Sequence, residues 1–206
     1  LNCGTCIACR RGRTNCCTSL RVLGVHTDGG MRECILVPAS KLHASEKLTL
    51  EQLALVETLG IGAHAVRRAA LDPGEQVVVV GAGPIGLTVM QFARLAGAEV
   101  IALDISAERL EFAQAQGLAD HAVRAGADSD AQIGAITHGD LPTAVFDATG
   151  NAASMMRGFE LVANGGRLIF VGLMQGDITF NDPNFHRREI TLLASRNATS
   201  GDLRGV

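Results

Sequence analysis

The sequence predicts an α/β protein in which a doubly wound, six-stranded parallel sheet is joined to part of a smaller β domain. Three observations predict this fold. Short apolar strands alternate with amphipathic helices over residues 72–206, as expected for a parallel sheet covered on both faces. A GxGxxG segment follows the first of these strands, and five of the six cysteines lie within residues 3–17. We expect domains at 1–55 and 72–206, with a joining helix over 56–71.

The composition narrows the possible functions. The 206 residues are 47% hydrophobic with a formal net charge of -3, so the chain can bury a core and has no basic stripe that would favour nucleic acid. Apolar runs such as Val77–Val80 are too short to cross a bilayer. No secretory signal opens the chain, and we expect a cytoplasmic protein that binds neither nucleic acid nor membrane. Residue 1 is Leu, so we expect the chain to begin inside a longer protein.

The opening cysteines allow two interpretations. One is a disulfide framework, although such bridges are reduced in the cytosol. The other is a structural zinc site, which the spacing favours: two residues separate Cys3 from Cys6 and Cys6 from Cys9, and the pair Cys16 and Cys17 follows. Two-residue gaps let successive sulfurs point at one ion, and zinc takes four ligands in a tetrahedron. One member of the pair completes the set, and four thiolates leave no open position for catalysis.

The loop between these cysteines is basic. Four thiolates on a divalent ion carry a net charge of about -2, which Arg10, Arg11 and Arg13 can offset unless they are simply solvated. Zinc binding is worth roughly 10–16 kcal/mol in peptides, which is enough to order a loop with little apolar core. Cys34 stands alone, and we expect it to be a small buried apolar residue.

The segment after the loop has a different character. Residues 18 to about 55 alternate strand-like pieces with a glycine turn, which predicts the tail of a small β domain. The stretch 51–71 is helical in character and joins this domain to the next.

The stretch 71–104 predicts a dinucleotide site. A β-branched run typical of a central parallel strand leads into GAGPIG at 81–86. Gly81 permits the tight turn, Gly83 lets the backbone approach a pyrophosphate, and Gly86 lets the following helix pack against the strand. The helix N-terminus then presents free N–H groups to phosphates. The expected cofactor contacts here are Gly81, Gly83, Pro84, Ile85 and Gly86.

The next strand ends in an acidic residue, Asp104. A carboxylate at this position accepts hydrogen bonds from the ribose hydroxyls and repels the extra phosphate of NADP, by about 4 kcal/mol at ~4 Å and an effective dielectric near 20. The following residue is Ile105 rather than Arg, so we expect NAD rather than NADP. Asp104 could instead cap a helix, a role that suits Ser106 better. Arg109 lies one helical turn further on and either covers the adenine side or is solvated.

The remaining chain completes the alternation. Four more strands are predicted at 121–123, 143–150, 165–173 and 190–195, with helices at 107–116 and 153–162. Pairs of residues follow three of these strand ends: Thr149-Gly150, Gly172-Leu173 and Ser195-Arg196. Ligands of open α/β sheets bind at the carboxyl ends of the strands, so we expect these pairs to line the nicotinamide and its ribose rather than to be ordinary turns.

Together these motifs resemble the zinc-containing medium-chain alcohol dehydrogenase family, and within it the polyol and sugar-acid branch. The resemblance rests on the Cys-x2-Cys-x2-Cys-x7-Cys loop, Glu57, HAV at 64–66, GAGPIG with Asp104, and DATG at 147–150, in this order over essentially the whole chain. It implies an NAD-binding Rossmann domain beside part of a GroES-like catalytic domain. It also selects Cys17 as the fourth ligand of the structural zinc, with Cys3, Cys6 and Cys9.

The resemblance further implies a catalytic zinc whose Cys and His ligands precede the cysteine loop in the family, so that this chain corresponds to the middle of the enzyme. Glu57 is the one candidate left beside that zinc, as a ligand or through water, although Thr58 replaces the usual proline. Glu57 could instead be an exposed carboxylate near a helix start. A lone helical histidine such as His64 is more often packed than catalytic.

The implied activity is oxidation of a secondary alcohol of a sugar acid or polyol. Zinc would lower the pKa of the hydroxyl, and a hydride would pass to NAD. The implied partners are a small-molecule substrate and further copies in a homodimer or homotetramer. Two alternatives stay open: a zinc-independent quinone or enoyl reductase of the same superfamily, against which the cysteine loop and Glu57 argue, and a non-catalytic NAD-binding module.

Overall fold

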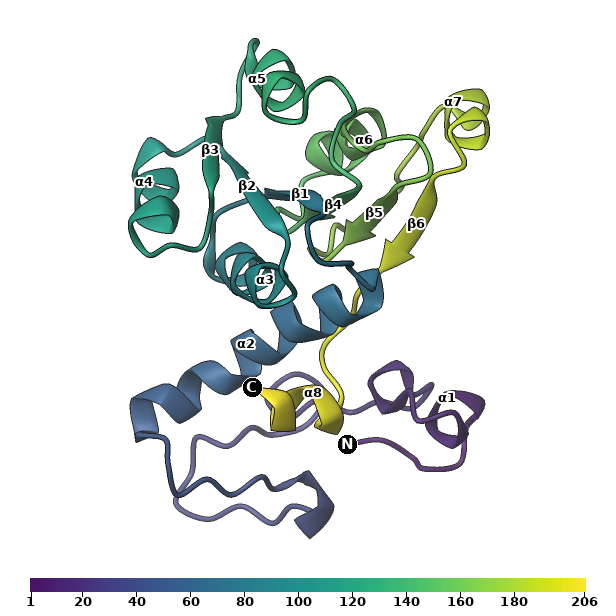
Figure 1. The fold of residues 1–206 in the computed structure, drawn as a ribbon. Helices are drawn as coiled ribbons and strands as arrows, with labels where there is room; N and C mark the ends of the chain where they lie inside the picture. The colour runs from purple at the N-terminus through teal and green to yellow at the C-terminus, as the bar shows by residue number, and fades with distance from the viewer.

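Six parallel strands form one sheet in the computed structural model, which describes residues 1–206 (Figure 1). The order across the sheet is β3-β2-β1-β4-β5-β6, so the first strand lies in the middle and later strands are added on either side. The strands are β1 Gln76–Val80, β2 Glu99–Asp104, β3 His121–Arg124, β4 Ala144–Asp147, β5 Arg167–Phe170 and β6 Thr191–Ala194. The predicted doubly wound sheet is confirmed, and each of the six strands overlaps a predicted stretch, although β1 begins one residue earlier and β3 ends one residue later than expected.

Helices cover both faces of this sheet. Two apolar cores result: one lies under α2, α3 and α4, and the other lies under α5 and α6. The helices are α1 Ile7–Arg10, α2 Leu50–Ala69, α3 Pro84–Leu95, α4 Ala107–Ala115, α5 Ser129–Ile136, α6 Ala152–Leu161, α7 Asp182–Arg187 and α8 Ser200–Gly205. None of these helices combines the length and the apolar character that crossing a membrane requires.

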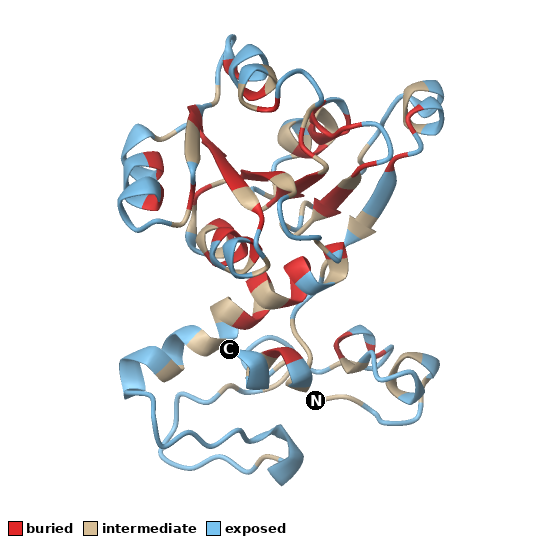
Figure 2. Cartoon of the chain, viewed as in Figure 1, coloured by how far each residue is buried: buried red, intermediate tan, exposed pale blue.

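Strand β1 supplies both cores. Val77 and Val79 belong to the first core, and Val78 and Val80 belong to the second. Successive side chains of a strand point to opposite faces, so a continuous run of valines suits a strand that is covered on both sides. Figure 2 shows that the buried residues gather in this sheet and in the helix faces against it.

Helix α2 links the sheet to the lobe formed by the first 49 residues (Figure 1). A capping box at Thr49 and Gln52 starts the helix, and the chain leaves it through Ala70 at a φ of 50°. The helix therefore begins several residues before position 56, the expected start of the joining helix. All of its buried residues lie in the second half, and Gly62 allows close contact with α3, since a Cβ there would lie 2.5 Å from the Thr88 hydroxyl oxygen.

The lobe differs from the expected β domain. Residues 18–49 contain no strand, only an isolated bridge between Leu23 and Thr27 and a short 3-10 helix at Ala39–Lys41. A strand needs a hydrogen-bonding neighbour along its length, and no other segment of the chain pairs with this one. Apolar alternation alone therefore does not produce a strand here.

The expectation that Cys34 is buried is wrong, because Cys34 is exposed. Its apolar neighbours are uncovered as well: Leu36 is fully exposed, and Ile35 is 43% exposed. Nothing packs over this segment, so the small apolar character of Cys34 does not lead to burial. Figure 2 shows the lobe as mostly exposed chain.

A pair of glycine variants tests the packing of the glycine loop. A Cβ on Gly86 would lie 1.7 Å from the Gly81 carbonyl oxygen, whereas a Cβ on Gly83 would meet nothing within 4 Å. We expect Gly86→Ala to lower the free energy of unfolding in urea by about 3 kcal/mol or more, because backbone must move. Gly83→Ala is the matched control and should cost about 1 kcal/mol or less, the price of a poorer N-cap. Equal losses in both variants would contradict this packing.

Candidate functional site

The cysteine loop gathers four sulfurs in one place. The Sγ atoms of Cys3, Cys6, Cys9 and Cys17 all lie within 4.8 Å of one another. Helix α1 follows Cys6, and a 3-10 turn at Thr14–Cys16 returns the chain so that Cys17 faces the other three. Cys16 is exposed and lies outside the group, and all six cysteines are free thiols rather than disulfides.

Backbone donors prepare these sulfurs for a metal. The Cys6 N–H donates to Cys3 Sγ at 3.3 Å, and the Cys3 N–H donates to Cys17 Sγ at 3.2 Å. Hydrogen bonds from the Cys9 and Thr18 backbone lower the pKa of Cys6 to about 5, and the Cys6 N–H lowers the pKa of Cys3 to about 7. Burial instead raises the pKa of Cys9. Thiolates are the form that binds metal, so half of the cluster is already biased towards binding.

The donor set fits zinc. Four sulfurs at ~2.3 Å from a tetrahedral ion lie about 3.8 Å apart, and the observed sulfurs, all within 4.8 Å of one another, need only a small contraction to reach that spacing. Four thiolates fill the coordination shell, which makes this a structural centre and not a catalytic one. Among the loop arginines, Arg10 donates to the Thr5 carbonyl, whereas the side chains of Arg11 and Arg13 form no hydrogen bond or ion pair.

The glycine loop connects β1 to α3. Gly81 has a φ of +96°, a conformation that favours glycine. Gly83 is the N-cap of α3 without any side-chain cap, and Pro84 occupies the first turn, so the helix N–H groups stay available to an anion. Ile85 lies one residue further along α3. The open space over Gly83 and the tight contact at Gly86 fit the backbone approach that a bound pyrophosphate requires.

Asp104 holds this loop in place from the neighbouring strand. It ends β2 and is 7% exposed. Its Oδ2 accepts the Ala82 N–H at 2.6 Å, and its Oδ1 accepts the Ser106 N–H at 2.8 Å. Each oxygen keeps a lone pair for a further donor. The carboxylate therefore both fixes the glycine loop and lines the adjoining cavity.

Two cavities of about 520 Å³ and about 620 Å³ flank the loop. They share Gly83, Ile105 and Arg109, and Thr149 lines the first of them. Asn151, whose Oδ1 caps α6 by accepting a hydrogen bond from the Ser154 N–H, also lines the first cavity. Sequence reasoning missed Asn151, although its position just after the fourth strand was the available signal.

The other predicted nicotinamide contacts lie outside these cavities. Gly172 packs against Gly150, where a Cβ on Gly172 would meet the Gly150 nitrogen at 2.3 Å. Leu173 is 87% exposed. The Ser195 hydroxyl is buried without a partner, and the Arg196 carbonyl accepts a hydrogen bond from Asn15 at 2.8 Å.

Glu57 stands apart from every group of metal-binding side chains. It is an exposed residue in the first half of α2, and the cysteine cluster is the only group of three or more His, Cys, Asp or Glu residues that could hold an ion. These 206 residues therefore do not assemble a catalytic metal site around Glu57.

A buried polar network joins α2 to the cysteine loop and to α8. His64 is 1% exposed, and its Nδ1 lies 2.9 Å from Asp202 Oδ2 on α8. Asn15, from the cysteine loop, places Nδ2 at 3.3 Å from His64 Nε2. This pattern fits a neutral imidazole whose proton is on Nδ1. No local sequence pattern indicates this network, because its members lie far apart in the chain.

The groups of this network differ in ionisation. Burial lowers the pKa of His64, and Asp202 only partly counteracts this effect. Burial opposes ionisation of Asp202 too, but hydrogen bonds from Thr199 and the contact with His64 outweigh it, and the pKa of Asp202 is lowered. Arg67 Nε pairs with Asp202 Oδ1 at 2.9 Å. The network thus holds a neutral histidine beside an ionised Asp–Arg pair.

Comparison with known proteins identifies the family. Residues 84–206 match the model of the zinc-binding dehydrogenases, and residues 1–47 match that of the alcohol dehydrogenase GroES-like domain. The chain belongs to the zinc-binding dehydrogenase family.

Individual relatives lie in the same group. L-galactonate-5-dehydrogenase of Escherichia coli is 44% identical over 99% of this chain and 60% of its own length. An NAD-dependent alcohol dehydrogenase of Sulfurisphaera tokodaii is 32% identical over 98% of this chain and 60% of its own length. The chain therefore spans about 60% of these curated relatives.

Solved structures agree with this fold. Galactitol-1-phosphate dehydrogenase from Escherichia coli superposes with a TM-score of 0.88 at 26% identity, over 100% of this chain and 62% of that one. An Escherichia coli alcohol dehydrogenase complexed with NADH superposes with a TM-score of 0.90 at 29% identity, over 98% of this chain and 60% of that one.

Matched serine variants test the metal centre. We expect Cys17→Ser to lose one bound zinc ion per chain, because three thiolates remain where four lie together. Cys16→Ser removes an exposed thiol outside the cluster and should retain the metal. Metal analysis of the purified variants gives the ratio directly. Retention of zinc in Cys17→Ser together with its loss in Cys16→Ser would overturn the assignment.

Acid should destabilise the protein through His64. Its folded pKa is lowered, so the unfolded state binds a proton first as the pH falls below about 6.5. The stabilisation is complete above that pH and is lost below it, by at most about 1.4 kcal/mol per pH unit from one group. We expect the free energy of unfolding to fall between pH 7.5 and pH 5.5 at saturating zinc.

His64→Gln should make this pH dependence shallower, even if the variant is less stable throughout. Replacing the exposed His186 with Gln controls for a general effect of histidine removal and should leave the slope unchanged. An equally steep slope in His64→Gln would contradict a neutral buried imidazole.

Proposed function

We propose that this chain carries the cofactor-binding domain and the structural zinc lobe of an NAD-dependent dehydrogenase that oxidises a secondary alcohol of a sugar acid or polyol. The observation that carries the proposal is the glycine loop fixed by Asp104 between two cavities. The names of the relatives supply the substrate class, with L-galactonate-5-dehydrogenase and galactitol-1-phosphate dehydrogenase among them.

In this proposal each residue of the site has a distinct task. Gly81, Gly83 and Gly86 shape the backbone around the pyrophosphate, and the first N–H groups of α3 donate to its oxygens. Asp104 accepts hydrogen bonds from the adenosine ribose, and Arg109 lies beside the adenine, since Asp104 lines the first cavity and Arg109 lines both. The chemistry that NAD supplies when bound is acceptance of a hydride from the alcohol carbon.

The other predicted positions are assigned to the nicotinamide side and to the catalytic metal. Thr149 lines the first cavity and suits the nicotinamide side. For Gly172, Leu173, Ser195 and Arg196 the support is their place after β5 and β6, at the carboxyl edge of the sheet. Glu57 is proposed beside a catalytic metal, as the family resemblance implies, and no step through that metal is derived from these residues. The partners proposed for the whole protein are a small-molecule alcohol substrate and further copies of the chain.

Enzyme assays on the full-length protein test this function. We expect NAD reduction with L-galactonate, and a lower kcat/KM with sorbitol and with simple alcohols. Asp104→Asn should reduce the preference for NAD over NADP about tenfold or more, because the repulsion of the additional phosphate is lost. Initial rates with both cofactors measure this ratio.

Glu111→Gln is the matched control, since Glu111 is an exposed residue of α4 outside both cavities. It should keep the cofactor ratio. NADH binding without turnover of any alcohol would favour the non-catalytic module, and turnover of quinones after zinc removal would favour the reductase. A protein that binds neither NAD nor NADH would overturn the proposal.

A further inference from the structure

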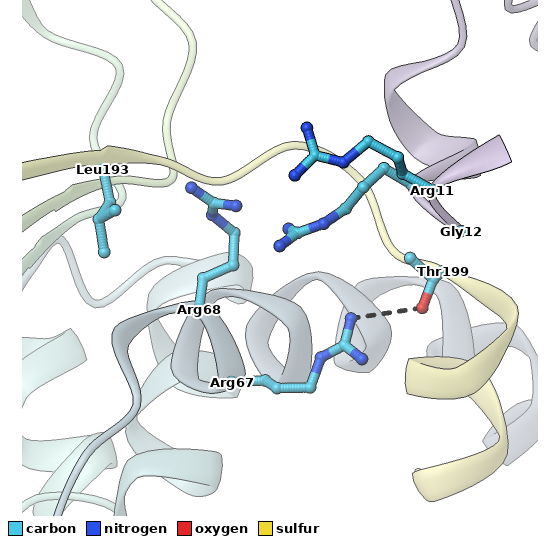
Figure 3. Close-up of a pocket in the computed structure, with 7 residues that line it drawn as sticks. Arg11, Gly12, Arg67, Arg68, Leu193 and Thr199 are labelled. Carbon is cyan, nitrogen blue, oxygen red and sulfur yellow. Dashed lines mark hydrogen bonds between the residues drawn. The ribbon is translucent and has the colours of Figure 1, made fainter. Parts of the chain in front are cut away.

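A third pocket lies away from the glycine loop, between the cysteine loop, the end of α2 and strand β6 (Figure 3). It has a volume of about 560 Å³ and shares no residue with the two cavities beside Gly83. Its lining residues are Arg11, Gly12, Arg13, Arg67, Arg68, Leu193 and Thr199. Four of the seven are arginines and none is acidic, so the pocket is strongly positive.

Most of this charge has no partner within the chain. Arg67 pairs with Asp202 and donates to the Thr199 hydroxyl at 3.4 Å. The side chains of Arg11, Arg13 and Arg68 form no hydrogen bond or ion pair, and Arg68 Nε is buried without any acceptor. A buried donor without a partner is costly. Arg11 and Arg13 are exposed and Arg68 is half-buried, so three guanidinium groups gather at this pocket without a carboxylate partner in a chain whose net charge is -3.

The side chains converge from two separate segments. Figure 3 shows Arg11 extending from the cysteine loop across the gap that Arg68 enters from α2, while Arg67 turns aside towards Thr199. The negative end of the α2 dipole favours basic residues in its last turn, but this does not explain the arginines of the loop. A loaded tetrathiolate centre attracts Arg11 and Arg13, but this does not explain Arg68.

The chemistry of the lining indicates the ligand. A guanidinium presents a planar fork of donors that matches phosphate oxygens in pairs. The three unpaired guanidinium groups offer more N–H donors than one carboxylate can accept. A phosphate group has several acceptor oxygens and up to two negative charges. Leu193 is the only apolar side chain present, so the pocket offers little to an aromatic or aliphatic ligand.

We propose that this pocket binds a phosphate-class anion that bridges the cysteine loop and helix α2. This inference is independent of the proposed dehydrogenase function. The anion is either inorganic phosphate or the phosphate group of a small metabolite. A ligand that binds only the folded protein raises its stability in proportion to occupancy, so the bound anion fastens the cysteine loop to the Rossmann domain.

Calorimetric titration of the zinc-loaded full-length protein tests the proposal. Inorganic phosphate and glycerol 3-phosphate are titrated separately at constant ionic strength, with chloride as the reference anion, and thermal unfolding is recorded in parallel. We expect saturable binding and a rise in melting temperature with at least one phosphate compound but not with chloride. Tighter binding of glycerol 3-phosphate indicates a metabolite, and equal or weaker binding indicates free phosphate.

Three variants locate the site. Arg68→Gln and Arg11→Gln should each weaken the binding about tenfold or more, because each removes one fork from one side of the pocket. Arg21→Gln removes the same charge from an exposed position of the same lobe outside the pocket, and it should bind like the parent protein. Saturating NADH should leave the phosphate affinity unchanged.

Several results would overturn the proposal. These are absence of saturable phosphate binding, equal stabilisation by chloride, equal weakening in Arg21→Gln, and competition between phosphate and NADH. A change of oligomeric state in Arg68→Gln without any phosphate binding would assign the arginines to a protein contact instead. Zinc analysis of each variant ensures that loss of binding does not reflect loss of the metal.

Discussion

The central position of β1 is the constraint on which the cofactor half of the structure depends. Its four consecutive valines are buried against two different cores, and the strand pairs with β2 on one side and β4 on the other. Both neighbours end in a buried aspartate, Asp104 and Asp147. Asp104 holds the Ala82 N–H of the glycine loop, and Asp147 Oδ1 accepts the Thr149 N–H at 2.9 Å. The loops after these three strands are therefore each tied to a buried carboxylate, and the open space over Gly83 lies at the edge that they form.

The cysteine lobe obeys a different constraint. Most of its residues are exposed (Figure 2), so hydrophobic burial contributes little there, and the four sulfurs are the main element that can fix its loop. Neither apolar core includes a residue of the lobe, and polar contacts join the lobe to the rest of the chain. Asn15 reaches both His64 and the Arg196 carbonyl, which connects the cysteine loop to α2 and to the segment after β6 at one point. The loop that carries the four sulfurs is thus held next to the segment that follows β6.

The parts that the sequence could predict are those whose signal is local. The valine run, the GxGxxG spacing and the two-residue cysteine gaps each lie within a few residues, and the structure has the corresponding strand, turn and sulfur cluster. The parts that it could not predict depend on distant partners. Asn15 and Arg196 are 181 residues apart, and His64 and Asp202 are 138 apart. The strand expected after residue 18 and the burial of Cys34 also needed a neighbouring segment, and no segment of this chain covers that region.

Near the end of helix α2, the charged side chains on one side are paired and those on the other side are not. On one side, His64, Asp202 and Arg67 form a closed set in which nearly every polar atom has a partner. On the other side, Arg68 has a buried Nε without an acceptor and faces two further unpaired arginines. Repulsion between like charges lowers stability. Arg67 is paired with Asp202, whereas no group of this chain pairs with the neighbouring Arg68. An anionic ligand beside Arg68 would neutralise the charge on that side of the helix. The dipole of α2 accounts only for the arginines at the end of the helix, and attraction to the metal centre accounts only for those of the cysteine loop.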